Sequence, residues 1–194
     1  LEAFQQAGAR LVAIDSISDA ALPQIDGLFI GGGFPETHMQ ALEDNSGFRQ
    51  QLAQLIASGL PVYAECGGLM YLARTIEWNG DRHDMVGAIP ADILVESKPQ
   101  GRGYVRLEES GDGLWPAPPG QPIAAHEFHY SRFINLPKDA RFAFRVLRGT
   151  GIDGEHDGYI HNNMLACYTH QRNTKRNNWV VRFTDFVRQC KTAS

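Results

Sequence analysis

The segment from residue 61 to residue 72, P-V-Y-A-E-C-G-G-L-M-Y-L, constrains the fold more than any other part of the chain. An apolar run typical of a buried strand ends at Cys66, and two glycines lead from it directly into an apolar helical pattern. A strand joined to a helix by so short a turn is the building unit of open α/β sheets. The turn predicts that Cys66 lies at the carboxyl end of a strand, the edge where such sheets carry functional residues.

The first 75 residues alternate between strand and helix patterns. Apolar runs typical of buried strands occupy residues 11–14, 27–30 and 61–64. Residues 48–58 carry apolar side chains at helical spacing. This part of the chain therefore predicts a parallel sheet with crossover helices, and the helix that precedes the first strand leads us to expect that the chain is truncated at its N-terminus.

A second pattern, of short strands and turns, covers residues 84–168. The last element, residues 178–190, has the spacing of an amphipathic closing helix. We therefore predict one α/β domain over residues 1–194, with a mostly parallel sheet, helices on both faces and an antiparallel extension. The strands expected in the extension are residues 86–89, 104–107, 123–125, 142–146 and 164–168.

Composition excludes several classes of protein. A formal net charge of −4 with scattered Lys and Arg argues against a nucleic-acid partner. The apolar runs are far shorter than the ~20 residues of a membrane span. Three cysteines without paired spacing indicate a reducing compartment, so we expect a cytoplasmic protein that has no membrane partner and no disulfide.

Cys66 is a candidate nucleophile. A thiol at a helix N-terminus is favoured as the thiolate, and Gly67 and Gly68 permit a sharp turn that presents the sulfur at the sheet edge. The alternative is a buried cysteine that serves only as a small apolar residue, which is the commonest role of a free thiol. The turn alone leaves both interpretations open.

A glycine-rich loop follows the strand at residues 27–30, in the run D-G-L-F-I-G-G-G-F-P-E. It would present backbone N–H groups at the same sheet edge as Cys66, where they could bind an oxyanion. Gly67 would supply one donor, and Gly32 or Gly33 the second. A tight turn without a ligand is the alternative. Since no part of the sequence matches G-x-x-x-x-G-K-[ST], the loop is not a nucleotide-binding P-loop.

A cysteine nucleophile needs a base, and His170 is the candidate because it follows the apolar strand pattern A-C-Y-T-H. A second polar group, A-H-E-F-H-Y-S at residues 125–131, is interpreted either as substrate-binding or supporting residues or as a structural loop. A metal site is disfavoured, because no third ligand stands at metal-site spacing. The candidates in this second group are His126, Glu127, His129 and Tyr130.

Together these motifs resemble a known family. G-G-G-F-P-E, A-E-C-G-G-L-M-Y-L, H-E-F-H-Y-S and A-C-Y-T-H occur in the order and approximate spacing of the glutaminase domain of cobyrinic acid a,c-diamide synthases, within the class I glutamine amidotransferases. The resemblance implies a flavodoxin-like α/β fold and glutamine as the ligand. It also implies that Cys66 forms a thioester, that His170 enhances its nucleophilicity and that the glycine loop and Gly67 bind the oxyanion.

The chain departs from the family pattern after His170. Triad-type enzymes usually carry a glutamate two residues after the histidine, whereas Arg172 stands there. A catalytic dyad is therefore expected, with Glu65 and Glu127 as candidates to orient His170. The basic, Asn-rich segment N-T-K-R-N-N-W at residues 173–179 resembles a variant group thought to amidate siroheme.

The family also joins this domain to an N-terminal P-loop synthetase domain that uses ATP and Mg²⁺ to activate a tetrapyrrole carboxylate. We therefore expect no cofactor in this segment, and a tetrapyrrole acceptor reached through the synthetase domain. A homodimer is one possible arrangement. The interpretation from a different class is a non-catalytic α/β domain that binds or regulates the synthetase.

Overall fold

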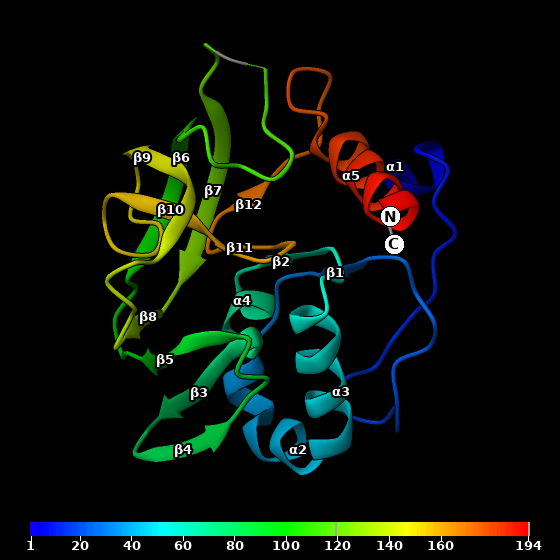
Figure 1. Cartoon of the computed structure of the whole chain (residues 1–194). Helices are drawn as coiled ribbons and strands as arrows, with labels where there is room; N and C mark the ends of the chain where they lie inside the picture. Colours follow the sequence, from blue (N-terminus) through cyan, green and yellow to red (C-terminus); the bar gives the residue numbers. More distant parts are fainter. Residues whose placement is uncertain (119, 194) are drawn as a thin grey trace.

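A computed structural model describes residues 1–118 and 120–193 (Figure 1). Its helices are α1 (Glu2–Gln6), the 3₁₀ helix η1 (Pro35–His38), α2 (Met39–Asp44), α3 (Ser46–Ala57), α4 (Gly67–Leu72) and α5 (Trp179–Ala193). Within these residues the strands make one large and one small sheet. The large sheet has the order β1 (Leu28–Ile30), β2 (Val62–Glu65), β11 (Met164–Cys167), β10 (His156–His161), β9 (Arg141–Arg148), β6 (Gly101–Glu109), β7 (Ile123–His129), β12 (His170–Gln171).

The smaller sheet has the order β4 (Asp81–Asp84), β3 (Ala73–Trp78), β5 (Ile89–Val95), β8 (Ser131–Ile134). Asp92 of β5 links neighbouring strands of this smaller sheet. The carboxylate of Asp92 is 3% exposed, accepts hydrogen bonds from Arg74 and Thr75, and forms ion pairs with Arg74 and Arg82. These bonds compensate for the cost of burying the charge.

The large sheet is parallel only at one end. β1 pairs with β2, and β2 with β11, in parallel register, whereas the other pairings that the structure describes in this sheet are antiparallel. The expectation of a mostly parallel sheet is therefore wrong in detail, although the α/β architecture stands. The physical reason is visible in β7, whose residues alternate between buried and exposed as in a one-sided antiparallel sheet.

Two expected strands differ from the structure. Residues 11–14 form no strand, and Leu11 and Val12 are exposed, because no described strand pairs with this segment. The strand expected at residues 86–89 begins only at Ile89, since Gly87 adopts a positive φ of 76° that interrupts an extended chain. The closing helix and the strands around Tyr63 and Ala166 lie where they are expected.

The parallel strands bury both faces, which explains their continuous apolar sequence. Val62 of β2 packs in the core formed with Leu52 of α3, while Tyr63 packs on the opposite face against Phe4 of α1 and Trp179 of α5. Figure 1 shows these helices on the two sides of the sheet. Leu52 is 1% exposed, so truncation to alanine should cost about 2–5 kcal/mol. This rigid layer carries the turn at Cys66.

Candidate active site

The backbone of Cys66 lies in a strained turn between β2 and α4. Its φ of 49° is positive, and the three other described non-glycine residues with positive φ are asparagines, which tolerate this region better. The Cys66 amide donates to the Cys167 carbonyl oxygen at 2.7 Å, and the Cys66 carbonyl oxygen accepts from the Met70 amide at 3.0 Å. Strain that is held in place by such bonds is typical of functional sites.

The glycine loop packs directly on this turn. A Cβ atom on Gly67 would lie 2.4 Å from the Gly33 carbonyl oxygen, and one on Gly68 would lie 2.5 Å from that of Ile30. Any side chain at either position would push the loop away from the turn. The structure therefore brings Gly33 beside Gly67, as the sequence predicted, and explains both glycines by close approach of backbones.

His170 completes the group. Its Nδ1 lies 3.3 Å from Oε2 of Glu65, which leaves Nε2 free for the Cys66 side. Hydrogen bonds with Cys66 and with Glu65 raise the pKa of His170 to about 10, against the opposing effect of burial. The imidazole is therefore protonated at neutral pH and forms an ion pair with Glu65.

Glu65 is itself held in place. The Tyr63 hydroxyl donates to Oε1 at 2.8 Å, and the Gln171 amide donates to the same atom at 3.0 Å. The carboxylate is 9% exposed. Glu65 thus occupies the position that the sequence left open beside His170, because neither Gln171 nor Arg172 supplies a carboxylate. Glu127 does not reach this position.

Gly32 closes the other side of the imidazole. A Cβ atom on Gly32 would lie 2.6 Å from Cε1 of His170. The glycine loop therefore contacts the turn through Gly33 and the histidine through Gly32. His126 stacks on the His170 ring, with the centroids 4.9 Å apart and the planes at 18°. The β7–β12 pairing explains this contact, since His170 is the register partner of His126.

Asp157 holds the chain that leads to His170. Its fully buried carboxylate accepts hydrogen bonds from the amides of Tyr168 and Thr169 and from the Thr169 hydroxyl at 2.6 Å. Burial raises the pKa of Asp157, against these bonds. The sequence analysis missed this residue, because its partners lie 11 and 12 residues away in the chain. A lone acid within the apolar pattern of residues 157–160 was the available signal.

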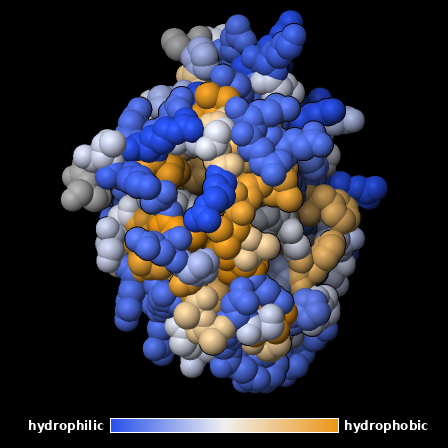
Figure 2. Space-filling model, turned by 90° about the vertical axis from the view of Figure 1, so that its right-hand side faces the viewer, coloured by the Kyte–Doolittle hydropathy of each residue, from blue (hydrophilic) through white to orange (hydrophobic). Residues whose placement is uncertain are grey.

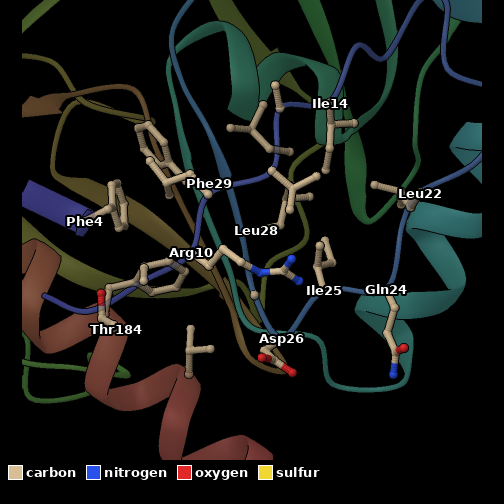
Figure 3. A pocket seen from close by; sticks show the side chains of 18 of the residues that line it. Phe4, Arg10, Ile14, Leu22, Gln24, Ile25, Asp26, Leu28, Phe29 and Thr184 are labelled. Atoms are coloured by element: carbon tan, nitrogen blue, oxygen red, sulfur yellow. The ribbon is translucent and has the colours of Figure 1, made fainter. Parts of the chain in front are cut away.

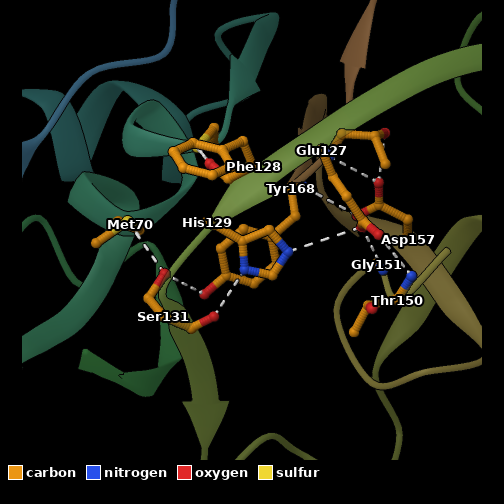
Figure 4. Close-up of polar contacts among 11 residues, drawn as sticks. Met70, Glu127, Phe128, His129, Ser131, Thr150, Gly151, Asp157 and Tyr168 are labelled. Atoms are coloured by element: carbon orange, nitrogen blue, oxygen red, sulfur yellow. Dashed lines mark hydrogen bonds and ion pairs between the residues drawn. The ribbon is translucent and has the colours of Figure 1, made fainter. Parts of the chain in front are cut away.

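The remaining sequence candidates divide along β7 (Figure 4). His126 and Phe128 are exposed on one face, whereas Glu127 and His129 are buried on the other. Glu127 accepts the amides of Thr150 and Gly151 at 2.8 and 2.9 Å. Burial tends to raise its pKa, but bonds from His129 and these amides lower it.

His129 is part of the same buried group. Its Nε2 lies 3.7 Å from Glu127, its Nδ1 bonds the Ser131 carbonyl oxygen at 2.8 Å, and its ring stacks on Tyr168. Figure 4 shows His129 between Glu127 on one side and Ser131 on the other. Their contacts favour a supporting role for Glu127 and His129, which is one of the two interpretations that the sequence left open.

A small cavity adjoins Cys66. The Cys66 side chain is 7% exposed, and its thiol donates to the Phe128 carbonyl oxygen at 3.9 Å. The cavity measures about 20 Å³, room for about one water molecule. Its lining includes Gly33, Phe34, Glu36 and Tyr130. Phe34 and Phe128 are 67% and 46% exposed, so movement of this aromatic rim is needed to admit a larger ligand.

A larger cavity lies elsewhere. It measures about 730 Å³ and is formed by the segment at residues 8–16, β1 and α5. Figure 3 shows Phe4, Ile14, Leu28 and Phe29 around it, and Figure 2 shows apolar surface gathered in a hollow on that face of the molecule. Neither Cys66 nor His170 lines it. This cavity is therefore not assigned as the candidate active site, despite its volume.

The described residues contain no group of three or more His, Cys, Asp or Glu placed to hold a metal ion. Nor does the described part of the chain hold a helix long and apolar enough to cross a bilayer.

Comparison with known sequences identifies relatives. The cobyrinate a,c-diamide synthase of Magnetococcus marinus is 45% identical over 88% of this chain and 36% of its own length. The enzyme of the same name from Archaeoglobus fulgidus is 44% identical over 84% of this chain and 35% of its own length. The chain thus spans about a third of the length of these relatives.

Solved structures share the fold. A crystal structure of a glutamine amidotransferase matches 96% of this chain and 90% of its own with a TM-score of 0.64 and 15% identity. A Thermoplasma acidophilum protein provisionally assigned to GMP synthase matches 99% of this chain and 86% of its own with a TM-score of 0.65 and 16% identity. Residues 1–178 match the model of the CobB/CobQ-like glutamine amidotransferase domain, and the chain belongs to that family.

Proposed function

We propose that Cys66, His170 and Glu65 hydrolyse glutamine, and that the ammonia amidates carboxylates of a tetrapyrrole. The observation that carries the proposal is the placement of one imidazole between a strained-turn cysteine and a buried carboxylate. Cys66 and His170 form a dyad. Glu65, the residue before Cys66, supplies the carboxylate that supports it in place of the usual triad.

In the first step, Cys66 attacks the side-chain amide carbon of glutamine. Cys66 reacts as the thiolate, paired with the protonated His170 to which it is hydrogen-bonded. A C–S bond forms, and the electron pair of the amide C=O moves onto oxygen. The amide of Gly67, with that of Gly32 or Gly33, donates to this oxyanion. The proximity of Gly33 to Gly67 supports the assignment.

His170 then moves protons. It gives its Nε2 proton to the departing nitrogen as the C–N bond breaks, so that ammonia leaves and a glutamyl thioester remains. The neutral imidazole next takes a proton from a water molecule that attacks the thioester. Glutamate departs, and the pair of Cys66 thiolate and protonated His170 is restored. Glu65 keeps Nδ1 protonated and the ring oriented throughout.

The ligation itself is proposed for another part of the protein. The names of the relatives support cobyrinate as the acceptor, amidated at its a and c carboxylates. A synthetase part that uses ATP and Mg²⁺ would activate the carboxylate, and we assign neither ligand to residues of this chain. Siroheme is the alternative acceptor, which the Asn-rich segment before Trp179 favours. We also propose a cytoplasmic location, which suits a reduced Cys66, and a homodimer.

The test uses the protein that carries this chain. Cys66→Ala should abolish glutamate release from glutamine while leaving amidation with free ammonia intact, for cobyrinate and siroheme as acceptors in parallel. Cys190→Ala in α5 is the matched control and should behave as wild type. Full glutaminase turnover in Cys66→Ala would exclude Cys66 as the nucleophile. Failure of a glutamine-derived diazo-ketone to label Cys66 would instead favour a non-catalytic, regulatory domain.

A further inference from the structure

Glu36 has an unusual environment for a carboxylate. It lies in η1 directly after the glycine loop, so its position relative to Gly33 is fixed by the backbone. Its Oε2 atom is buried and has no hydrogen-bond partner among the residues that the structure describes. A buried charged oxygen without a partner is costly, so most such groups in native proteins are satisfied.

The position of the side chain shows where a partner would come from. Glu36 lines the cavity beside Cys66, together with Met70, Phe128 and Tyr130. Of the described residues that line this cavity, Glu36 alone carries a carboxylate. Burial raises the pKa of Glu36, as expected for an acid with no positive neighbour. The cavity is small, so its lining residues are within reach of one bound amino acid.

A second observation concerns the position of Glu36 relative to Cys66, since both residues line this cavity. The pKa of Tyr168 is raised, first by burial and further by the negative charges of Cys66, Asp157 and Glu36. Tyr168 stacks on His129, which also lines the cavity. Glu36, Cys66 and His129 thus line one cavity.

We propose that Glu36 receives the α-ammonium group of the glutamine whose side-chain amide lies at Cys66. The assignment rests on the proposed glutaminase function and names a residue that determines its substrate. An ammonium group would supply the missing hydrogen-bond donors and the opposite charge, and would thereby remove the cost of burial. The α-carboxylate would be repelled from this position, so Glu36 also fixes which end of the amino acid faces it.

The experiment compares two substrates in wild type and three variants of the full chain. Glutamine is compared with glutaramate, which is glutamine without the α-amino group. Glu36→Gln keeps the shape of the side chain and removes the charge. Glu155→Gln, at an exposed position remote from the cavity lining, is the matched control for loss of one negative charge. Circular dichroism and Tm verify that each variant is folded.

Glu36→Gln should raise KM for glutamine on the order of 10- to 100-fold, the factor expected for one charge-assisted hydrogen bond, with little change in kcat. Its kcat/KM for glutaramate should equal that of wild type, because that substrate has no ammonium group. Glu155→Gln should match wild type with both substrates. Glu36→Asp keeps the charge on a shorter side chain and should give an intermediate KM for glutamine.

Other results overturn the assignment. If wild type hydrolyses glutamine and Glu36→Gln keeps its KM within twofold, Glu36 does not bind the substrate, although the glutaminase function stands. If both substrates lose activity equally in Glu36→Gln, its role is structural. If wild type releases no glutamate and a diazo-ketone glutamine analogue does not label Cys66, the glutaminase function fails and the assignment fails with it.

Discussion

Nδ1 of His170 lies 3.3 Å from Oε2 of Glu65, a residue that stands directly before the nucleophile on β2. One dipeptide at the end of β2 therefore supplies both partners of the imidazole: Cys66 on one side and Glu65 on the other. In the proposed mechanism, Glu65 thus takes the orienting role that neither Gln171 nor Arg172 can supply. The orienting role of Glu65 can therefore be tested separately from the role of Cys66.

Glu65→Gln should lower kcat on the order of 10²-fold, because the imidazole loses the charge that keeps it protonated and oriented. KM for glutamine should change little. The amide oxygen of Gln can still accept from Tyr63, so the fold should persist. Steady-state glutamate release measures the effect, with Glu155→Gln as the control. An unchanged kcat would show that His170 needs no carboxylate.

The protonation of His170 makes a second prediction. Its pKa in the folded protein, about 10, exceeds the ordinary value of 6.5. The stability contributed by the charged ring is therefore fully present below pH 6.5 and is lost as pH rises toward 10. The Tm of wild type should fall over this window, and His170→Gln should flatten that part of the curve. An NMR titration of the His170 ring gives the pKa directly, and Cys66→Ala should lower it.

Gly32→Ala tests the contact between the glycine loop and His170. Gly32 is not among the glycines with positive φ, so alanine is permitted by the backbone and its effect is steric. The new methyl group would lie 2.6 Å from Cε1 of His170 and must displace the ring. A displacement on the order of 1 Å can cost about 10²-fold in rate.

The matched control for that variant is Gly47→Ala, where the added methyl group meets open space in α3. It should keep wild-type kcat/KM. If Gly32→Ala also kept it, the ring and the loop would be farther apart during turnover than they are in the structure.

Glu127→Gln should destabilise the protein without slowing catalysis. The amide nitrogen of Gln cannot accept the N–H groups of Thr150 and Gly151, so one buried donor loses its partner at a cost of about 1–3 kcal/mol. Because the pKa of Glu127 is lowered, its stabilising effect is present above the ordinary value of 4.5 and is lost as pH falls through the folded value. Urea unfolding at neutral pH measures the loss. A fall in kcat in a variant that is as stable as wild type would show that Glu127 contributes to catalysis.

The sequence allowed the catalytic part of the fold to be predicted because that part is local. The strand, turn and helix around Cys66 are contiguous, and the glycine loop follows the neighbouring strand directly. His170 was proposed because it follows an apolar strand pattern, whose end is expected at a sheet edge. These predictions depend on short-range patterns, which the tertiary structure did not override.

Features that depend on pairing between distant segments were harder to predict. The apolar run at residues 11–14 has no strand partner among the described residues, and its pattern alone could not show this. The roles of Glu65 and Asp157 depend on neighbours about 105 and 12 residues away. The hairpin between β3 and β4 was missed although Asn79–Gly80 is a strong turn signal, and both residues have the positive φ that such turns need.

The two-residue strand that carries His170 pairs with β7, at the end of the sheet order, whereas the strand that carries Glu65 and leads into Cys66 is paired on both sides. Cys66 and Glu65 are therefore held by a strand with neighbours on both sides, whereas His170 is held by β7 and by the chain that Asp157 fixes. A shift of β7 would be passed to the imidazole through this pairing, while Glu65 kept its place on β2.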